Sequence, residues 1–167
     1  MNVNSFKKYL NNCFLLTIPI LVWNLIFTNQ LPQAFQPEVM WNDIPVYITY
    51  GENILRTIVF MLTMLMPLRI TTREQKIGLI LYVAGTLIYF LSWLPLMYYP
   101  ESNWSNHVIG FMAPAYTPVF WLIGIGIVGN AFYFRLPFKR WYFISVSILF
   151  LIFHNLHTFL IFNRIHI

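Results

Sequence analysis

Five apolar stretches, each close to twenty residues long, alternate with polar linkers along this chain of 167 residues. The hydrocarbon core of a bilayer is about 30 Å thick, and about 20 helical residues cross it. Helices are the expected form, because unpaired backbone groups are costly in lipid and the stretches lack the two-residue alternation of barrel strands. The pattern predicts five membrane-spanning helices, at residues 9–27, 46–68, 77–98, 112–134 and 141–162.

The linkers predict how these helices are connected. Residues 71–76 and 135–140 are short turns, so the helices on either side of each should be antiparallel neighbours. Residues 29–45 form a longer connection with three prolines, and residues 100–110 carry Pro, Ser, Asn and Gly. No repeat or change in composition divides the chain. We therefore expect residues 1–167 to form a single all-α domain, one antiparallel five-helix bundle.

Basic residues predict the orientation of the helices. Eight of the ten Lys and Arg residues lie at the N-terminus or in the second and fourth linkers. The first and third linkers contain acidic residues and no Lys or Arg. Under the positive-inside rule, the N-terminus is inside and the C-terminus outside. Arg164, in the outer tail, is the one basic terminal or linker residue that does not fit this orientation. We expect a multi-pass protein of a bacterial inner (cytoplasmic) membrane.

Composition excludes most other classes of protein. Hydrophobic residues make up 59% of the chain and charged residues 9%, whereas about a quarter of a typical soluble domain is charged. The net charge is +5, but the basic residues are scattered between apolar stretches and form no nucleic-acid-binding face. A single cysteine, Cys13, allows neither an intramolecular disulfide nor a cysteine-based zinc site. The lipid bilayer is the expected partner, and no nucleic acid is.

Charged and imidazole side chains inside the predicted spans lie at a common depth. A charge at the bilayer centre costs about 2.5 kcal/mol or more, so each one calls for a partner. Glu52 and Arg56 are four residues apart, share one helix face, and lie roughly 9 and 15 Å below the outer boundary. His154 and His157 fall in the same outer half of the last span. We expect these four side chains to converge inside the bundle.

Five further residues complete the candidate ligand-binding set. Asn24 and Tyr116 have a similar calculated height, Asn53 and Asn155 adjoin the charged and imidazole residues, and Trp93 could wall a pocket. The leading hypothesis is a polar and aromatic pocket in the outer half of the bundle. It would bind or move a small, partly apolar or amphipathic ligand. The sequence identifies no cofactor and no protein partner.

Two alternative functions stay open. No catalytic signature is present, but His154 and His157 share a helix face. With Glu52 they could form a two-histidine, one-carboxylate metal site, or perform acid–base chemistry, in an intramembrane enzyme. Alternatively, the polar groups could be purely structural, as in an accessory or immunity-type membrane subunit with no ligand.

Small and helix-breaking residues give the fourth stretch a character of its own. Gly124, Gly126 and Gly129 would let this helix approach a neighbour closely. Pro114 and Pro118 would bend or loosen its outer end. That end is then either a helix start or backbone opened beside a cavity.

The charged pair in the second span also yields a stability prediction. Sequence alone favours Arg56→Ala as more damaging than Glu52→Ala, because loss of the guanidinium would strand a short carboxylate in an apolar region. The opposite order follows if an unpaired cation costs more than a carboxylate that can neutralise itself.

Overall fold

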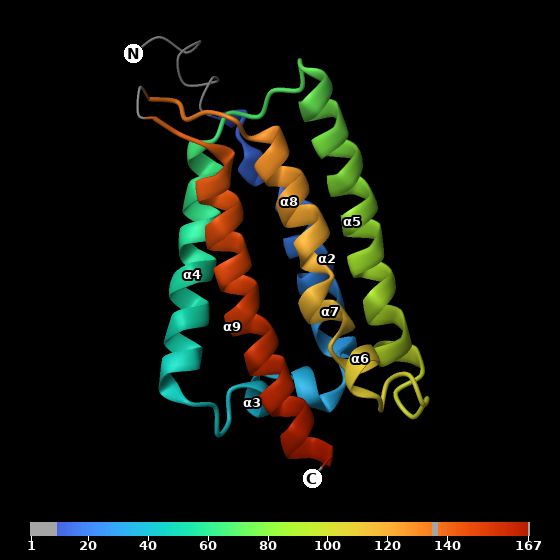
Figure 1. Cartoon of the computed structure of the whole chain (residues 1–167). Helices are drawn as coiled ribbons and strands as arrows, with labels where there is room; N and C mark the ends of the chain where they lie inside the picture. The colour runs from blue at the N-terminus through green and yellow to red at the C-terminus, as the bar shows by residue number, and fades with distance from the viewer. Residues whose placement is uncertain (1–9, 135–136, 167) are drawn as a thin grey trace.

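The computed structural model describes residues 10–134 and 137–166, and the elements in these residues are all helices (Figure 1). The longer helices are α2 (Ile18–Phe27), α4 (Val46–Leu65), α5 (Arg73–Tyr98), α8 (Pro118–Val128) and α9 (Arg140–His166). The short ones are η1 (Cys13–Leu16), η2 (Thr28–Gln30), η3 (Gln33–Phe35), α3 (Pro37–Met40), α6 (Val108–Phe111) and α7 (Ala113–Tyr116). The prediction of an all-helical chain is confirmed for the described residues.

Two helix pairs form the body of the molecule. Helix α5 packs against α8, α4 packs against α9, and contacts between α8 and α9 join the two pairs. Figure 1 shows that residues 66–72 and 129–134 lie at one end of the bundle. Residues 28–45 and 99–112, with their short helices, lie at the other end.

Glycines bring the backbones of α5 and α8 together. A Cβ atom added at Gly124 would lie 2.5 Å from the backbone nitrogen of Tyr82, and one added at Gly85 would lie 2.5 Å from that of Trp121. A Cβ added at Gly78 would lie 3.0 Å from the carbonyl oxygen of Gly124. Such small residues allow close helix approach, so the packing role predicted for Gly124 is confirmed.

Helix α5 begins four residues before the predicted start of the third span, at Arg73. Thr72 and Gln75 form a reciprocal capping box at this end. The Thr72 hydroxyl accepts from the backbone nitrogen of Gln75, and the Gln75 side-chain oxygen accepts from that of Thr72, both at 3.2 Å. Two N–H groups at the helix start thereby gain acceptors, which stabilises the extra turn.

The predicted fourth span was too long and too regular. It is divided into α7 and α8, with α6 directly before it, and helix ends at Val128, six residues before the predicted boundary. Pro118 begins α8 and has no N–H to continue the hydrogen-bond ladder from α7, which accounts for the break between them. At the other end, Gly129 adopts an extended conformation.

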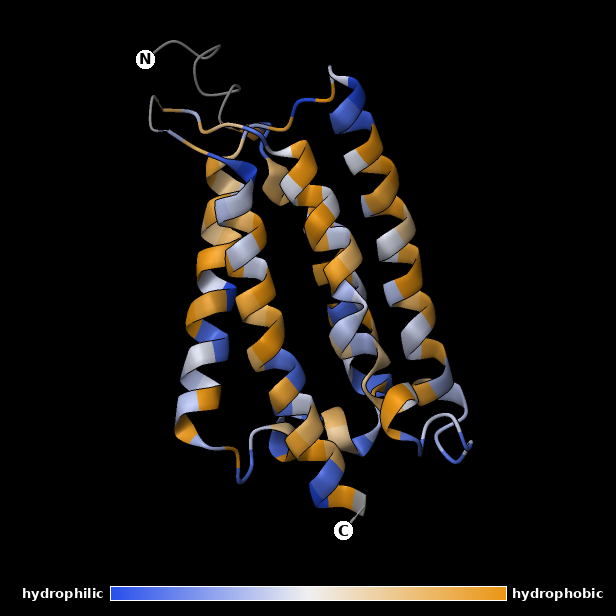
Figure 2. Cartoon of the chain, in the orientation of Figure 1, coloured by the Kyte–Doolittle hydropathy of each residue, from blue (hydrophilic) through white to orange (hydrophobic). Residues whose placement is uncertain are grey.

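Three helical stretches within the described residues are long and apolar enough to cross a membrane: Cys13–Gln30, Arg73–Tyr98 and Arg140–Ile165. The apolar stretch Ala113–Val128 is shorter. Helix α4 has 20 residues and contains Glu52 and Arg56, and it is not among these stretches. Figure 2 shows hydrophobic residues along the length of the long helices, with hydrophilic residues at the two ends of the bundle and also within α4 and α9. These properties suggest a protein embedded in a membrane.

Candidate ligand-binding site

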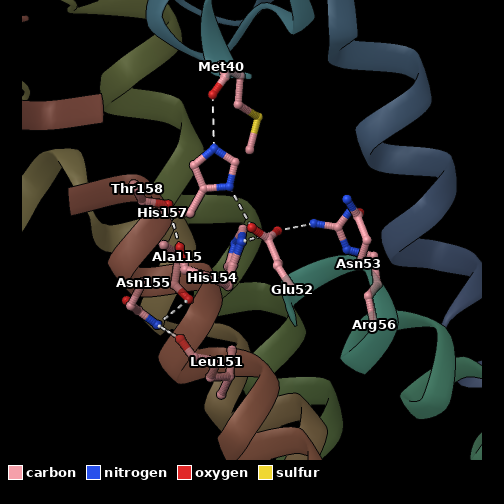
Figure 3. Close-up of polar contacts among 10 residues, drawn as sticks. All are labelled: Met40, Glu52, Asn53, Arg56, Ala115, Leu151, His154, Asn155, His157 and Thr158. Carbon is pink, nitrogen blue, oxygen red and sulfur yellow. Dashed lines mark hydrogen bonds and ion pairs between the residues drawn. The ribbon is translucent and has the colours of Figure 1, made fainter. Parts of the chain in front are cut away.

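A buried carboxylate lies at the centre of a charged cluster, which consists of Glu52, Arg56, His154 and His157 (Figure 3). The Glu52 side chain is 0% exposed. Its Oε1 accepts a hydrogen bond from the Arg56 guanidinium and lies 3.0 Å from Nδ1 of His154. Its Oε2 lies 2.5 Å from Nδ1 of His157. The four side chains thus meet, as their common depth predicts, while a ligand-binding role for them stays a prediction.

Helix geometry explains why the four side chains meet. Glu52 and Arg56 are one turn apart on α4, and His154 and His157 are nearly one turn apart on α9, so each pair shares a helix face. Because α4 packs against α9, the two faces can meet across the interface. Figure 3 shows the carboxylate of Glu52 pointing from α4 toward both imidazole rings.

Both ring nitrogens of His157 are engaged. Its Nε2 lies 2.9 Å from the backbone carbonyl oxygen of Met40, which can only accept, so Nε2 carries a hydrogen. Its Nδ1 and Oε2 of Glu52 are 2.5 Å apart, a separation that requires a proton between them. The Trp41 ring covers the imidazole, with 4.8 Å between ring centroids. His157 therefore connects α9 to the segment that contains α3 and leaves no nitrogen for another ligand.

The contacts of His154 and His157 with Glu52 do not have the arrangement of a two-histidine, one-carboxylate metal site. The two histidines direct Nδ1 to different oxygens of one carboxylate, rather than converging with it on a common point. Across residues 10–134 and 137–166, no group of three or more His, Cys, Asp or Glu side chains is arranged to hold a metal ion.

Phe150 and Asn53 position the outer members of the cluster. The Phe150 ring stacks on the His154 ring, with centroids 5.5 Å apart and an interplanar angle of 13°. The guanidinium carbon of Arg56 lies 5.8 Å from the same phenyl centroid, within cation–π range. The Asn53 side-chain oxygen accepts from Arg56 at 3.5 Å. The Arg56 and His154 side chains keep 33% and 20% of their surface exposed.

A cavity of about 360 Å³ lies beside the charged cluster. Arg56 and His154 line it, whereas Glu52 and His157 lie behind them. Most of the other lining side chains are apolar or aromatic, and they come from both helix pairs and from α2. The volume lies in the lower part of the range of small-molecule sites, about 300–1,000 Å³.

The structure separates the nine predicted ligand-binding residues into groups. Those that line the cavity are Asn24, Arg56, Trp93 and His154. Glu52 contacts Arg56 and His154, Asn53 contacts Arg56, and His157 contacts Glu52. Asn155 instead donates to the backbone carbonyls of Leu151 and Ala115, which ties α9 to α7. Tyr116 is exposed and donates to the carbonyl of Ile109, so it lies outside the cavity wall.

Sequence reasoning missed several residues of the cavity wall. Tyr89 lines it and donates to the side-chain oxygen of Asn24 at 2.7 Å. The Trp121 ring also lines it, and the indole N–H groups of Trp121 and Trp93 are buried with no hydrogen-bond partner among the described residues. The sequence signal for this wall is the pair Pro114 and Pro118. Both line the cavity, as expected if these prolines open the helix backbone beside it.

The fold and the site define a class: an all-helical protein with membrane-compatible helices and a cavity that a charged cluster borders. Comparison with known proteins finds no family model, no curated protein and no solved structure that matches this chain. The cavity and the charged cluster are therefore the features that bear on its function.

Proposed function

We propose that this protein binds or moves a small, partly apolar ligand in the cavity beside the charged cluster. The observation that carries the proposal is that the cavity wall combines two polar side chains with a mostly apolar lining. Arg56 and His154 provide oriented polar groups, while most other lining side chains are apolar. Small-molecule sites typically combine an apolar lining with a few fixed polar groups. Glu52 holds both polar side chains in place before a ligand arrives.

We further propose that five helical segments cross a membrane, with the N-terminus inside and the C-terminus outside: Cys13–Gln30, α4, α5, residues 108–128 and α9. Arg69, Arg73 and Lys76 lie at one end of the bundle, and the acidic linkers lie at the other, which supports this orientation. Arg164 lies at the acidic end, where it donates to the carbonyls of Asn42 and Val39. Arg164, the basic residue that does not fit the orientation, thus has a structural role.

This arrangement places the cavity in the outer half of the membrane, which we take to be a bacterial inner membrane. Reporter fusions after Arg73, after Arg140 and at the C-terminus test it. The first two reporters should be inside and the third outside. An inner C-terminus would contradict the odd number of spans.

The two alternative functions have less support. The metal hypothesis needs both histidines as ligands, but His157 uses both ring nitrogens in contacts with Glu52 and Met40, so only His154 is left for metal or acid–base work. The accessory-subunit hypothesis gives no reason for a cavity with a cationic wall. Ligand binding accounts for the cavity and the charged cluster together.

A cavity-filling substitution tests the proposal. Ala115 is 3% exposed and lines the cavity, so Ala115→Phe should occupy it. The matched control is Ala84→Phe, on the exposed face of α5. The full chain in nanodiscs is titrated with ω-bromodecan-1-ol, ω-bromodecanoate and ω-bromodecyltrimethylammonium, because bromine quenches nearby tryptophans and Trp93 and Trp121 line the cavity.

We expect saturable quenching by at least one probe in the native protein and in Ala84→Phe. Ala115→Phe should weaken that binding about tenfold or more, since the side chain and the probe compete for one volume. Quenching that never saturates, or that is equal in Ala115→Phe, would show that the cavity binds no amphiphile of this kind.

A further inference from the structure

We infer that the ligand of this cavity is an anionic amphiphile, a monocarboxylate on an apolar chain, whose head group binds to Arg56 beside His154. The inference rests on the proposed function, that the cavity takes a small, partly apolar molecule. It adds the charge of the ligand and the wall at which the head group lies.

The protons of the charged cluster determine its formal charge. The Met40 carbonyl requires a hydrogen on Nε2 of His157, and the short contact to Glu52 requires a second proton at Nδ1 or Oε2. Glu52 and His157 therefore sum to zero charge, whichever atom holds the shared proton. Arg56 then gives the cluster a net charge of +1 with His154 neutral, and of +2 with His154 protonated.

No other acidic side chain of the described residues balances this charge. Of the five Asp and Glu residues in the sequence, the four besides Glu52 are all exposed: Glu38, Asp43, Glu74 and Glu101. None of them has an ion pair or hydrogen bond with the cluster, and Glu74 pairs with Arg140 at the opposite end of the bundle. A sheltered positive charge without a counter-charge is unfavourable, so a bound anion would be favoured there.

The hydrogen-bonding capacity left over at the cavity belongs mainly to donors. Arg56 uses one N–H group on Glu52 and one on Asn53, out of the five that a guanidinium offers. Trp93 and Trp121 have buried indole N–H groups that lack partners in the described part of the chain. A carboxylate accepts from the fork of an arginine through two parallel hydrogen bonds. The ligand should therefore present acceptors to this wall.

The charge balance and the apolar lining favour a carboxylate over a phosphate. A phosphate monoester carries about −1.5 to −2 charges at neutral pH, so it would be balanced only with His154 protonated, whereas Arg56 alone balances a carboxylate. Away from Arg56 and His154, the wall includes Ile20, Phe60 and Leu122, which suit an alkyl or terpenoid chain.

Part of the cavity wall is exposed on α2 and α4. Leu21 and Asn24 on α2 are exposed lining residues, and Arg56 on α4 retains a third of its side-chain surface. In the proposed membrane arrangement this side faces lipid. An amphiphile dissolved in the bilayer would enter there with its head group level with Arg56.

The experiment compares the head groups of the three probes on one chain length. The native protein in uncharged-lipid nanodiscs at alkaline pH, where the carboxylate probe is ionised, is titrated with each probe. We expect ω-bromodecanoate to half-saturate quenching at a concentration about tenfold below that of the alcohol, and the ammonium probe to give no saturable quenching. In Arg56→Gln the preference for carboxylate over alcohol should fall to less than about threefold. Arg69→Gln, which removes one exposed charge at the other end of the bundle, should leave the preference unchanged.

Each outcome separates the inference from the proposed function. Equal affinity for carboxylate and alcohol, or a preference for the ammonium, would overturn the inference and leave the cavity a ligand site. Absence of saturable quenching by all three probes would overturn the proposed function itself. A folded Arg56→Gln protein that keeps the full preference would show that Arg56 does not bind the head group. Should Arg56→Gln fail to fold, the comparison of probes on the native protein decides alone.

Discussion

The two helix pairs of this bundle are held together in opposite ways. Between α5 and α8, glycines let the two backbones touch. Between α4 and α9, the buried Glu52 carboxylate joins side chains of both helices. Backbone contact fixes helix position but offers a ligand nothing to bind, whereas a charged cluster fixes position and also leaves donors at its edge. The α5–α8 pair therefore fixes the fold, and we call it the frame. The α4–α9 pair provides the polar groups that a ligand can contact.

The cavity draws on both pairs. Tyr89 and Trp93 on α5, with Trp121 on α8, form an aromatic wall that the glycine contacts hold in place. Arg56 on α4 and His154 on α9 add the polar groups. This division predicts that substitutions in the two pairs will differ in kind.

Removing the centre of the charged cluster should have the largest effect. Glu52→Ala takes away the acceptor that Arg56, His154 and His157 share, and breaking a buried ion pair lowers the free energy of unfolding by about 3–5 kcal/mol. Glu52→Gln keeps the shape and one acceptor oxygen, so it should lose less. Reversible unfolding in mixed micelles measures both. Native stability in Glu52→Ala would show that α4 and α9 do not depend on the cluster.

The same experiment ranks the two members of the salt bridge, and the structure reverses the order that sequence alone favours. Without Arg56, the Glu52 carboxylate still contacts two imidazoles, so it is not stranded. Arg56 itself is one-third exposed. We therefore expect Arg56→Ala to be less damaging than Glu52→Ala. A lower unfolding free energy for Arg56→Ala than for Glu52→Ala would support the opposite ranking.

In the frame, even one methyl group should be disruptive. The Cβ of Gly124→Ala would lie 2.5 Å from the backbone nitrogen of Tyr82, and overpacking of this kind lowers the free energy of unfolding by about 1–3 kcal/mol. The matched control is Gly51→Ala in α4, whose Cβ would meet the Phe153 ring. That ring is a half-buried side chain that can turn aside, and alanine favours a helix over glycine by about 1 kcal/mol.

Gly51→Ala should therefore stay close to native stability. Thermal melts of the two variants in the same detergent give the comparison directly. Equal losses of stability in the two variants would mean that α4 and α9 are packed as tightly as α5 and α8. The two helix pairs would then not differ in how their backbones pack.

Local rules explain what the sequence predicted well. Apolar run length located the long helices, and the fixed rise of a helix was enough to put Glu52 level with His154 and His157. The early start of α5 was also within reach, because Thr72 and Gln75 have the spacing of a capping box.

The cavity could not be predicted from such rules. It depends on where α2 lies, and α2 is positioned by contacts distant in sequence, such as the hydrogen bond from Tyr89 to Asn24. Asn24 and Asn155 show the difference. Both are predicted at the height of the polar layer, yet Asn24 lines the cavity while Asn155 bonds to backbone carbonyls. Depth alone does not say which way a side chain faces.

A smaller effect is expected at the start of α5. Thr72→Ala removes the hydroxyl that accepts from the backbone of Gln75, and loss of such a cap lowers the free energy of unfolding by about 1 kcal/mol. The control is Thr57→Ala on the exposed face of α4, where the hydroxyl bonds only to the carbonyl of Asn53 in its own helix. That substitution should be nearly neutral. A comparable loss of unfolding free energy in both variants would show that the capping box does not stabilise the start of α5.

The smallest effect is expected at a second Arg–Glu pair, which repeats the chemistry of Arg56 and Glu52 at the surface. Arg140 on α9 donates to Glu74 on α5 at 2.6 Å, and Glu74 is 67% exposed where Glu52 is 0% exposed. Exposed pairs contribute about 0–1 kcal/mol to the free energy of unfolding, and salt screens them over about 8 Å at physiological ionic strength. Glu74→Ala should therefore cost less than about 1 kcal/mol and lose even that effect at high salt, whereas the loss in Glu52→Ala should persist. Unfolding of both variants at low and high salt measures the difference. If the two losses were equal, or equally sensitive to salt, burial would not be what makes the charged cluster between α4 and α9 distinctive.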